Sequence, residues 1–183
     1  MTDYFPHEKE TPASPSVPHS REAEEAVVGA VLINPDVYYD IAAFLKGDDF
    51  YIHRNKWMWE AIEKLKEKRT DIDLLTVSNE LEKSGKLSEI GGSAYITSLI
   101  NQVPTSLNAE SYARIVKEYS IRRGLINSAN EIASLAYKEQ DIEKIKSGAY
   151  DSVEKAISYS VSSEMKPAKQ LMSEFYDHVD ELS

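Results

Sequence analysis

The spacing of apolar residues in the first part of the chain predicts a series of short amphipathic helices. Apolar side chains recur there every three or four residues, which is the period of one helix face. Ser20 is a suitable cap for a first helix over 21–33, and Pro35 takes the first position of a second, short helix. Asp73 caps a later helix that ends near Gly85, a residue type suited to a left-handed helix end.

Another of these short helices contains both tryptophans of the chain. Its apolar face consists of Trp57, Met58, Ala61, Ile62 and Leu65. We predict that Trp57 anchors the core and that Trp59 lies near its margin. A further helix opens at Gly91-Gly92 and is closed by Val103-Pro104.

From Asn108 the pattern changes to that of two long helices. No further proline occurs before Pro167, and apolar residues continue to repeat at intervals of three or four. This predicts one helix to about Lys138 and a second from about Asp141 to Val161, joined by a short loop into an antiparallel hairpin. The residues expected to face inward are Tyr112, Ile115, Val116, Tyr119, Ile126, Ala129, Ile132, Ala133 and Ala136, then Ile142, Ile145, Ala149, Val153, Ala156 and Ile157.

The last segment has large apolar side chains on one predicted helix face. Pro167 is placed to start this helix, and acidic residues oppose the apolar stripe. The stripe includes Leu171, Met172, Phe175, Tyr176 and Val179. Because a helix of this length is marginally stable alone in water, we expect it to dock in a groove elsewhere.

Together these patterns predict an all-α chain in four parts. Residues 1–19, rich in proline and poor in apolar positions, form a disordered arm. Residues 20–107 form a compact, globular helical subdomain, and 108–161 form the long protruding hairpin. Residues 162–183 form a linker and a separate C-terminal helix. No segment alternates with period two for long enough to be a strand.

Charge and composition narrow the classes of function. The 183 residues have a formal net charge of -10, which disfavours a free-standing nucleic-acid-binding module. Cysteine is absent, which excludes disulfides, zinc–thiolate sites and a cysteine nucleophile, and fits a cytoplasmic location. No segment has the roughly 18 consecutive apolar residues of a membrane span, or the layout of a secretory signal.

The sequence contains no catalytic, cofactor-binding or metal-binding constellation. Its seven glycines match neither a phosphate-binding nor a dinucleotide-binding loop, and its four histidines lack the spacing of metal ligands. Trp57 and Trp59 beside lysines offer a surface for stacking single-stranded bases, but neighbouring glutamates neutralise it. Arg122-Arg123 is interpreted as a solvated edge or an ion-pair donor.

Six short blocks of the sequence are informative when they are taken together. They are PHSREAEEAVVGAVL (18–32), DFY followed by WEAI (49–51 and 59–62), IDLLTV (72–77), GGSAY (91–95), VPT (103–105) and YARIV (112–116). Each block alone is weak evidence for any family. Their order and spacing, from Pro18 to about Val161, resemble the N-terminal domain of DnaB-type replicative DNA helicases.

The resemblance implies a chain that has no active site of its own and belongs to a larger enzyme. In this family such domains pair through their hairpins and build a trimer-of-dimers collar on a hexameric ring. The helix from Pro167 resembles the linker helix, which docks on the motor domain of a neighbouring subunit. A RecA-like motor that uses ATP and Mg to unwind DNA, and that makes most of the DNA contacts, is expected after Ser183.

The resemblance also implies a docking site for primase, with a helicase loader as a further candidate partner. The matching positions are Tyr95, Ile126 and Ile132, although all three also fit ordinary core positions. The two arginines before Gly124 come one position earlier than in the family. Because glycine weakens a helix, we expect the long helix to bend at this point.

Two other classes of function remain as alternatives. A stand-alone helical adaptor, such as a helicase loader or an inhibitor that imitates the collar, would have the same fold without a motor. A helical nucleic-acid binder would bind DNA with a steep dependence on salt, which the acidic net charge disfavours.

Overall fold

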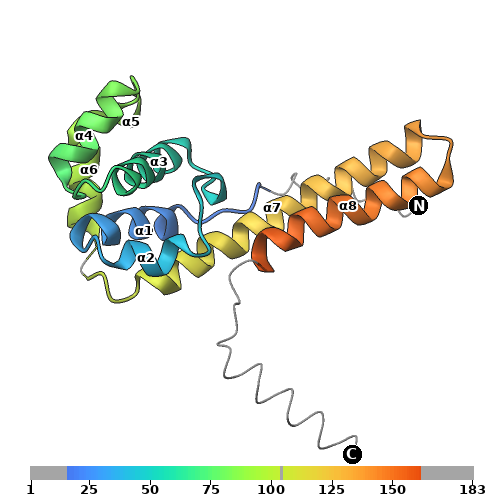
Figure 1. Ribbon diagram of the computed structural model, residues 1–183, viewed down its shortest axis with the longest axis horizontal. Coiled ribbons are helices and arrows are strands. Elements are labelled where there is room, and N and C mark those ends of the chain that lie inside the picture. Colours follow the sequence, from blue (N-terminus) through green and yellow to red (C-terminus); the bar gives the residue numbers. More distant parts are fainter. Residues whose placement is uncertain (1–15, 104, 162–183) are drawn as a thin grey trace, which may run out of the picture.

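The computed structural model describes residues 16–103 and 105–161, and these form an assembly of helices (Figure 1). The helices are α1 (Arg21–Ile33), α2 (Val37–Ala42), α3 (His53–Glu67), α4 (Leu74–Lys83), α5 (Leu87–Ile90), α6 (Gly92–Gln102), α7 (Ala109–Lys138) and α8 (Ile142–Val161). A short 3-10 helix, η1 (Gly47–Asp49), precedes α3. No strand occurs among the described residues, and the all-α prediction is confirmed.

Capping residues set the ends of several helices. The Ser20 hydroxyl accepts a hydrogen bond from the backbone N–H of Ala23 at 3.2 Å, so α1 begins where its cap predicts. The Asp73 carboxylate accepts two backbone N–H groups in the first turn of α4, both at 2.8 Å. Helix α2 begins at Val37, later than predicted, because Pro35 lies in a turn.

Helix α1 is at the centre of the globular part. Val27, Val28 and Val31 are fully buried, and α1 packs against α3, α6 and α7. A Cβ atom built on Gly29 would lie only 2.6 Å from the backbone oxygen of Leu99 on α6. Glycine at this position therefore permits the close approach of α1 and α6.

Trp59 fills the middle of this core, and the prediction that Trp57 does so is wrong. The Trp59 side chain is fully buried, and its ring centroid lies 5.6 Å from that of Tyr38 and 5.4 Å from that of Phe50. Trp57 is only partly buried and lies beside the Lys86 ammonium. Because Trp59 is inaccessible, the two tryptophans do not form a base-stacking surface.

Helices α7 and α8 form the predicted antiparallel hairpin, which projects from the globular part (Figure 1). Small residues make the contact between them. A Cβ atom built on Gly124 would lie 3.4 Å from the Cβ of Ala156. The buried Ser128 hydroxyl donates to the backbone oxygen of Ser152 at 2.7 Å. Around Gly124 and Ser128, the two helices therefore meet along a seam of small side chains.

This seam differs from the predicted one. The sequence pattern predicts that four isoleucines face inward, and the structure contradicts this. They are Ile115, Ile126, Ile142 and Ile157, which are 39%, 47%, 59% and 44% exposed. Where Gly124 meets Ala156, large side chains on the seam would hold the helices farther apart, so the close contact excludes them there. Farther along the hairpin, the large Leu135 side chain is accommodated because it packs against Gly148. Helix α7 continues through Gly124 without interruption.

Two predicted segments fall largely outside the described residues. They are most of the 1–19 arm and the 162–183 segment with Leu171, Met172, Phe175, Tyr176 and Val179. Among the helices that the structure describes, none combines the length and the apolar character needed to cross a membrane.

Candidate protein-interaction site

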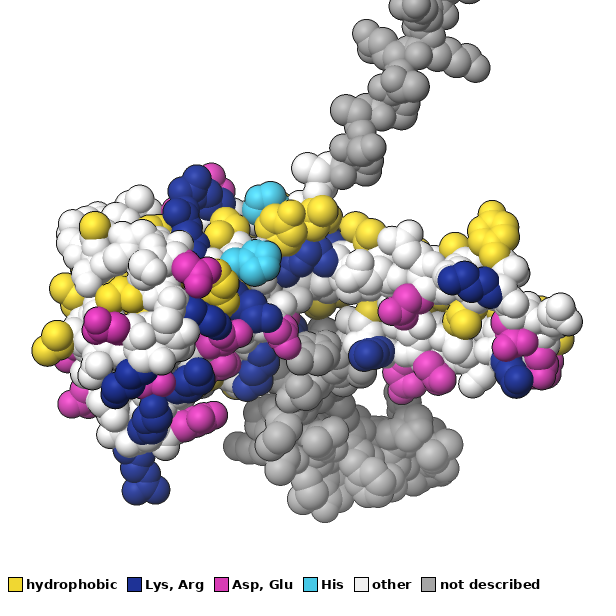
Figure 2. Space-filling model, turned by 90° about the horizontal axis from the view of Figure 1, so that it is seen from above, with side chains coloured by type: hydrophobic (Ala, Val, Ile, Leu, Met, Phe, Trp, Pro, Cys, Tyr) yellow, Lys and Arg dark blue, Asp and Glu magenta, His cyan; other side chains and the backbone are white. Residues whose placement is uncertain are grey.

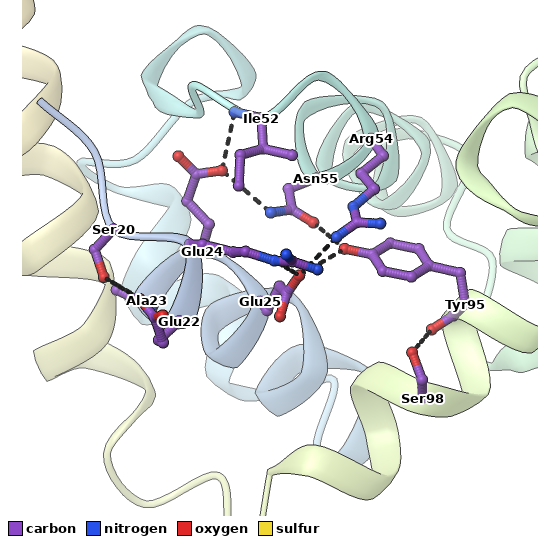
Figure 3. A network of polar contacts seen from close by, with 11 residues as sticks. Ser20, Glu22, Ala23, Glu24, Glu25, Ile52, Arg54, Asn55, Tyr95 and Ser98 are labelled. Carbon is purple, nitrogen blue, oxygen red and sulfur yellow. Dashed lines mark hydrogen bonds and ion pairs between the residues drawn. The ribbon is translucent and has the colours of Figure 1, made fainter. Parts of the chain in front are cut away.

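A buried carboxylate joins α1 to the beginning of α3 (Figure 3). Glu24 is 1% exposed and accepts hydrogen bonds from the backbone N–H groups of Tyr51 at 2.8 Å and Ile52 at 3.1 Å. It also accepts a hydrogen bond from Asn55 Nδ2 at 3.1 Å. Ile52 immediately precedes α3 and has no capping side chain, so Glu24, on a different helix, fixes the turn that leads into α3.

Tyr95, on α6, is tied to the same network and is half-buried (Figure 3). Its hydroxyl donates to Asn55 Oδ1 at 2.6 Å and lies 3.4 Å from a carboxylate oxygen of Glu25. The Arg54 guanidinium lies 4.2 Å from the centroid of the tyrosine ring. Burial, followed by the Glu25 carboxylate, raises the pKa of the Tyr95 hydroxyl, which therefore stays protonated and acts as a donor.

A second polar cluster lies where the hairpin leaves the globular part. The Lys117 ammonium is 3.1 Å from both carboxylate oxygens of Asp49, and both residues are buried. The Arg123 guanidinium donates to the backbone oxygens of Pro18 and Asp49. Arg123 is therefore a link between the two parts, whereas only Arg122 matches the predicted solvated ion pair.

The surface at this junction combines aromatic and basic groups. The His19 ring stacks on Tyr51 with the centroids 4.5 Å apart, and the Arg123 guanidinium lies 5.6 Å from the centroid of the Tyr51 ring. Figure 2 shows histidine, apolar and basic side chains gathered where the globular part meets the hairpin. Tyr51 thus contacts both His19, which precedes α1, and Arg123 on α7.

One side of the hairpin is apolar and uncovered. Successive residues of an α-helix are rotated by about 100°, so the residues that follow those of the seam point to one side of it. Because α7 and α8 are antiparallel, the same rotation brings these residues of both helices to the same side. They are Leu125, Ala129, Ile132 and Ala136 from α7 and Ile142, Val153 and Ile157 from α8, and we name them the apolar hairpin face.

The opposite side of the hairpin is polar and borders a cavity. The cavity, of about 480 Å³, opens between η1 and the two hairpin helices. Its charged lining consists of Asp48, Asp49, Glu131, Lys117, Arg123 and Lys155, so acidic and basic groups balance. In the part of the chain that the structure describes, no three histidine, aspartate or glutamate side chains are grouped as a metal site requires.

The three predicted partner-contact residues lie on two parts of the molecule. Tyr95 is on the globular part, whereas Ile126 and Ile132 are on the hairpin. Ile126 is 47% exposed and Ile132 is partly buried, so neither belongs to the core of this chain. Ile132 lies on the apolar hairpin face, and Ile126 lies about 100° beyond Leu125 around α7.

The contacts among the buried polar residues that connect these parts do not follow from the sequence pattern. Glu24 lies near the N-terminus of α1, but it also lies three, four and seven residues before Val27, Val28 and Val31. It therefore shares the buried face of α1, which was a usable signal of a buried carboxylate. Its partners around Asn55 are distant in sequence, and nothing in the pattern identified them.

Comparisons with known proteins agree with this fold. The family described as "DnaB-like helicase N terminal domain" matches residues 16–118. Replicative DNA helicase DnaC of Bacillus subtilis (strain 168) is 34% identical over 166 residues, which cover 90% of this chain and 37% of that protein.

Two solved structures are also similar. The N-terminal domain of DnaB helicase from Mycobacterium tuberculosis has a TM-score of 0.72 and 30% identity, and the match covers 75% of this chain and 99% of that one. A DnaB-like replicative helicase, whose structure describes its interactions with primase, has a TM-score of 0.58 and 21% identity. That match covers 86% of this chain and 35% of the other, and it supports the fold alone.

A helical globular part with a projecting hairpin is thus the architecture of a helicase N-terminal domain. The chain belongs to the DnaB-like helicase N-terminal domain family, since the family match covers more than half of its residues. It spans 37% of the length of the Bacillus relative.

Proposed function

We propose that this chain forms a non-catalytic collar of a hexameric replicative DNA helicase, where it joins subunits and recruits primase. The observation that carries the proposal is the uncovered apolar hairpin face in a member of this family. Covering exposed apolar side chains with a partner removes them from water, which lowers the free energy of the complex. This face offers such side chains, among them Ile142, which is 59% exposed.

A second copy of the chain is the partner that this face fits. Two hairpins related by a two-fold axis would each offer the same apolar residues to the other, which is how closed dimers form. Leu125 and Ile157, 40% and 44% exposed in one copy, would both be covered. Three such dimers would complete the six-membered ring.

Primase is the proposed partner of Tyr95, Ile126 and Ile132. The structural relative described together with its primase interactions supports this assignment by analogy of fold. Ile126 is exposed and lies beyond the apolar hairpin face, so it stays accessible after hairpins pair. Ile132 lies on that face, so it would contribute to the pairing of hairpins and would reach primase only at the edge of the paired hairpins.

Titration calorimetry of the chain with its cognate primase tests this assignment. We expect Tyr95→Ala and Ile126→Ala each to weaken binding by about tenfold, as truncation of an interface residue does. Ile126→Ala should leave self-association unchanged, whereas Ile132→Ala should weaken both self-association and primase binding. Tyr137→Ala is the matched control, since Tyr137 is 91% exposed at the far end of α7. Unchanged affinity in both Tyr95→Ala and Ile126→Ala would refute the site.

The remaining parts of the proposal concern the whole enzyme. ATP and Mg chemistry, DNA unwinding and most DNA contacts would belong to a RecA-like motor domain. The stripe from Leu171 to Val179 would dock on the motor of a neighbouring subunit, and a helicase loader is a further candidate partner. The cytoplasmic location stays a prediction. A reading frame that ends without a phosphate-binding loop would favour the stand-alone adaptor instead.

A further inference from the structure

The segment from Asp49 to Ile52 is held from two sides. On the globular side, the Glu24 carboxylate accepts the backbone N–H groups of Tyr51 and Ile52. The adjoining Phe50 side chain is 4% exposed and packs in the core against Trp59. The segment therefore moves with α1 and α3.

On the hairpin side, the same segment is bound by α7. The Arg123 guanidinium donates to the backbone oxygens of Asp49 and, at 2.9 Å, of Pro18. The Lys117 ammonium lies 3.1 Å from the Asp49 carboxylate oxygens. Burial lowers the pKa of Arg123, and the nearby Glu24 and Asp49 carboxylates oppose this shift. A half-buried guanidinium with two carbonyl partners fixes its helix more firmly than a surface ion pair.

The network continues from this segment to Tyr95. Asn55 is fully buried and bridges the Glu24 carboxylate, through its Nδ2, to the Tyr95 hydroxyl, through its Oδ1. With its hydroxyl bound and Arg54 against its ring, Tyr95 has a fixed position relative to Glu24. A continuous set of contacts thus runs from Tyr95 on α6 to Arg123 on α7.

We propose that Asn55 and Arg123 are positioning residues of the primase-docking surface: they hold Tyr95 and Ile126, which lie on separate parts of the chain, in one fixed arrangement. This inference rests on the proposed function. Ile126 lies less than one helical turn beyond Arg123, so an anchor at Arg123 sets where Ile126 lies relative to the globular part. A partner that contacts both parts then binds without first ordering them.

Spin-label distance measurements test the arrangement directly. The natural sequence lacks cysteine, so Thr97→Cys on α6 and Asn130→Cys on α7, both exposed positions, would be the only labelled sites. Dilution with unlabelled chain restricts the signal to distances within one copy. We expect a narrow distance distribution that Arg123→Lys broadens, because lysine cannot bind two carbonyl oxygens in the guanidinium geometry.

Primase affinity is measured on the same variants. We expect Arg123→Lys and Asn55→Ser each to weaken primase binding by about fivefold, the effect typical of residues that couple two parts. Asn55 is fully buried and so acts without touching the partner. Arg122→Lys is the matched control, because Arg122 is exposed and pairs with Glu118 on the same helix. It should change neither the distance distribution nor the affinity.

The outcomes separate this inference from the proposed function. An unchanged distance distribution in Arg123→Lys overturns the inference, as does a broadened distribution with unchanged primase affinity. If Tyr95→Ala and Ile126→Ala leave primase binding intact, the proposed docking site fails, whatever the distances show. Should Arg123→Lys fail to fold, as judged by circular dichroism, Asn55→Ser decides the question through affinity alone: a loss supports the inference and an unchanged value overturns it.

Discussion

At the scale of single residues, buried polar groups contribute most of what the hydrophobic pattern does not predict. Glu24 holds the turn before α3 with a carboxylate that accepts three hydrogen bonds. We expect Glu24→Gln to lower the free energy of unfolding by about 1–3 kcal/mol, because its amide would turn a donor toward other buried donors. Denaturant titration of the variant and of the natural chain measures this difference in the free energy of unfolding. Glu22→Gln is the control on the same helix, exposed in the structure, and equal losses in both variants would contradict the role of Glu24.

Asp73 illustrates a residue whose role the sequence did predict. The hydrogen bond from the Thr76 backbone N–H holds the pKa of its carboxyl below the ordinary value. Its stabilising effect is therefore complete above pH about 4 and is lost as the pH falls through the lowered pKa. We expect Asp73→Ala to cost about 1 kcal/mol at neutral pH. The difference from the natural chain should narrow below pH about 4 in denaturant titrations, and a constant difference would be inconsistent with this cap.

At the scale of elements, two glycines have opposite expected effects. A Cβ on Gly29 would lie 2.6 Å from the Leu99 backbone oxygen and 2.7 Å from Val103, so Gly29→Ala should destabilise the fold by about 3 kcal/mol. A Cβ on Gly124 would lie 3.4 Å from Ala156, an ordinary contact, and alanine favours a helix. Gly124→Ala should therefore leave the melting temperature unchanged or raise it. A lower melting temperature in Gly124→Ala than in Gly29→Ala would contradict the described helix contacts.

The same scale shows what the sequence can and cannot predict. Helix ends at Ser20, Asp73 and Gly85 followed from local chemistry, because caps and left-handed glycines act over a few residues. Local chemistry did not predict which side chains of α7 and α8 lie between the two helices. The apolar and small residues of the hairpin share the same helical period, and only the close packing of α7 on α8 decides that Gly124 is inside and Ile126 outside.

At the scale of the whole molecule, the contacts that orient the hairpin join residues far apart in sequence. Lys117 pairs with Asp49, and Arg123 binds the backbone at Pro18, so no local pattern could have predicted either contact. The predicted contact residue Tyr95 was identified by resemblance alone. Its ties to Asn55 emerged only from the folded arrangement.

The apolar hairpin face leads to a prediction about assembly. A charge placed on a face that becomes buried costs several kcal/mol unless it is paired. Leu125→Glu and Ile157→Glu should therefore abolish self-association in analytical ultracentrifugation, with circular dichroism unchanged. Asn130→Glu, on the polar side of α7, is the matched control and should associate like the natural chain. Equal association of all three variants would place the interface elsewhere.

Sedimentation equilibrium of the unaltered chain over a series of concentrations tests the central claim most directly. One chain has a mass of 20.6 kDa. The collar proposal predicts that the average mass rises with concentration toward at least twice that of one chain, because the apolar hairpin face is covered by a second copy. A mass that stays at that of a single chain up to the highest attainable concentration would contradict it.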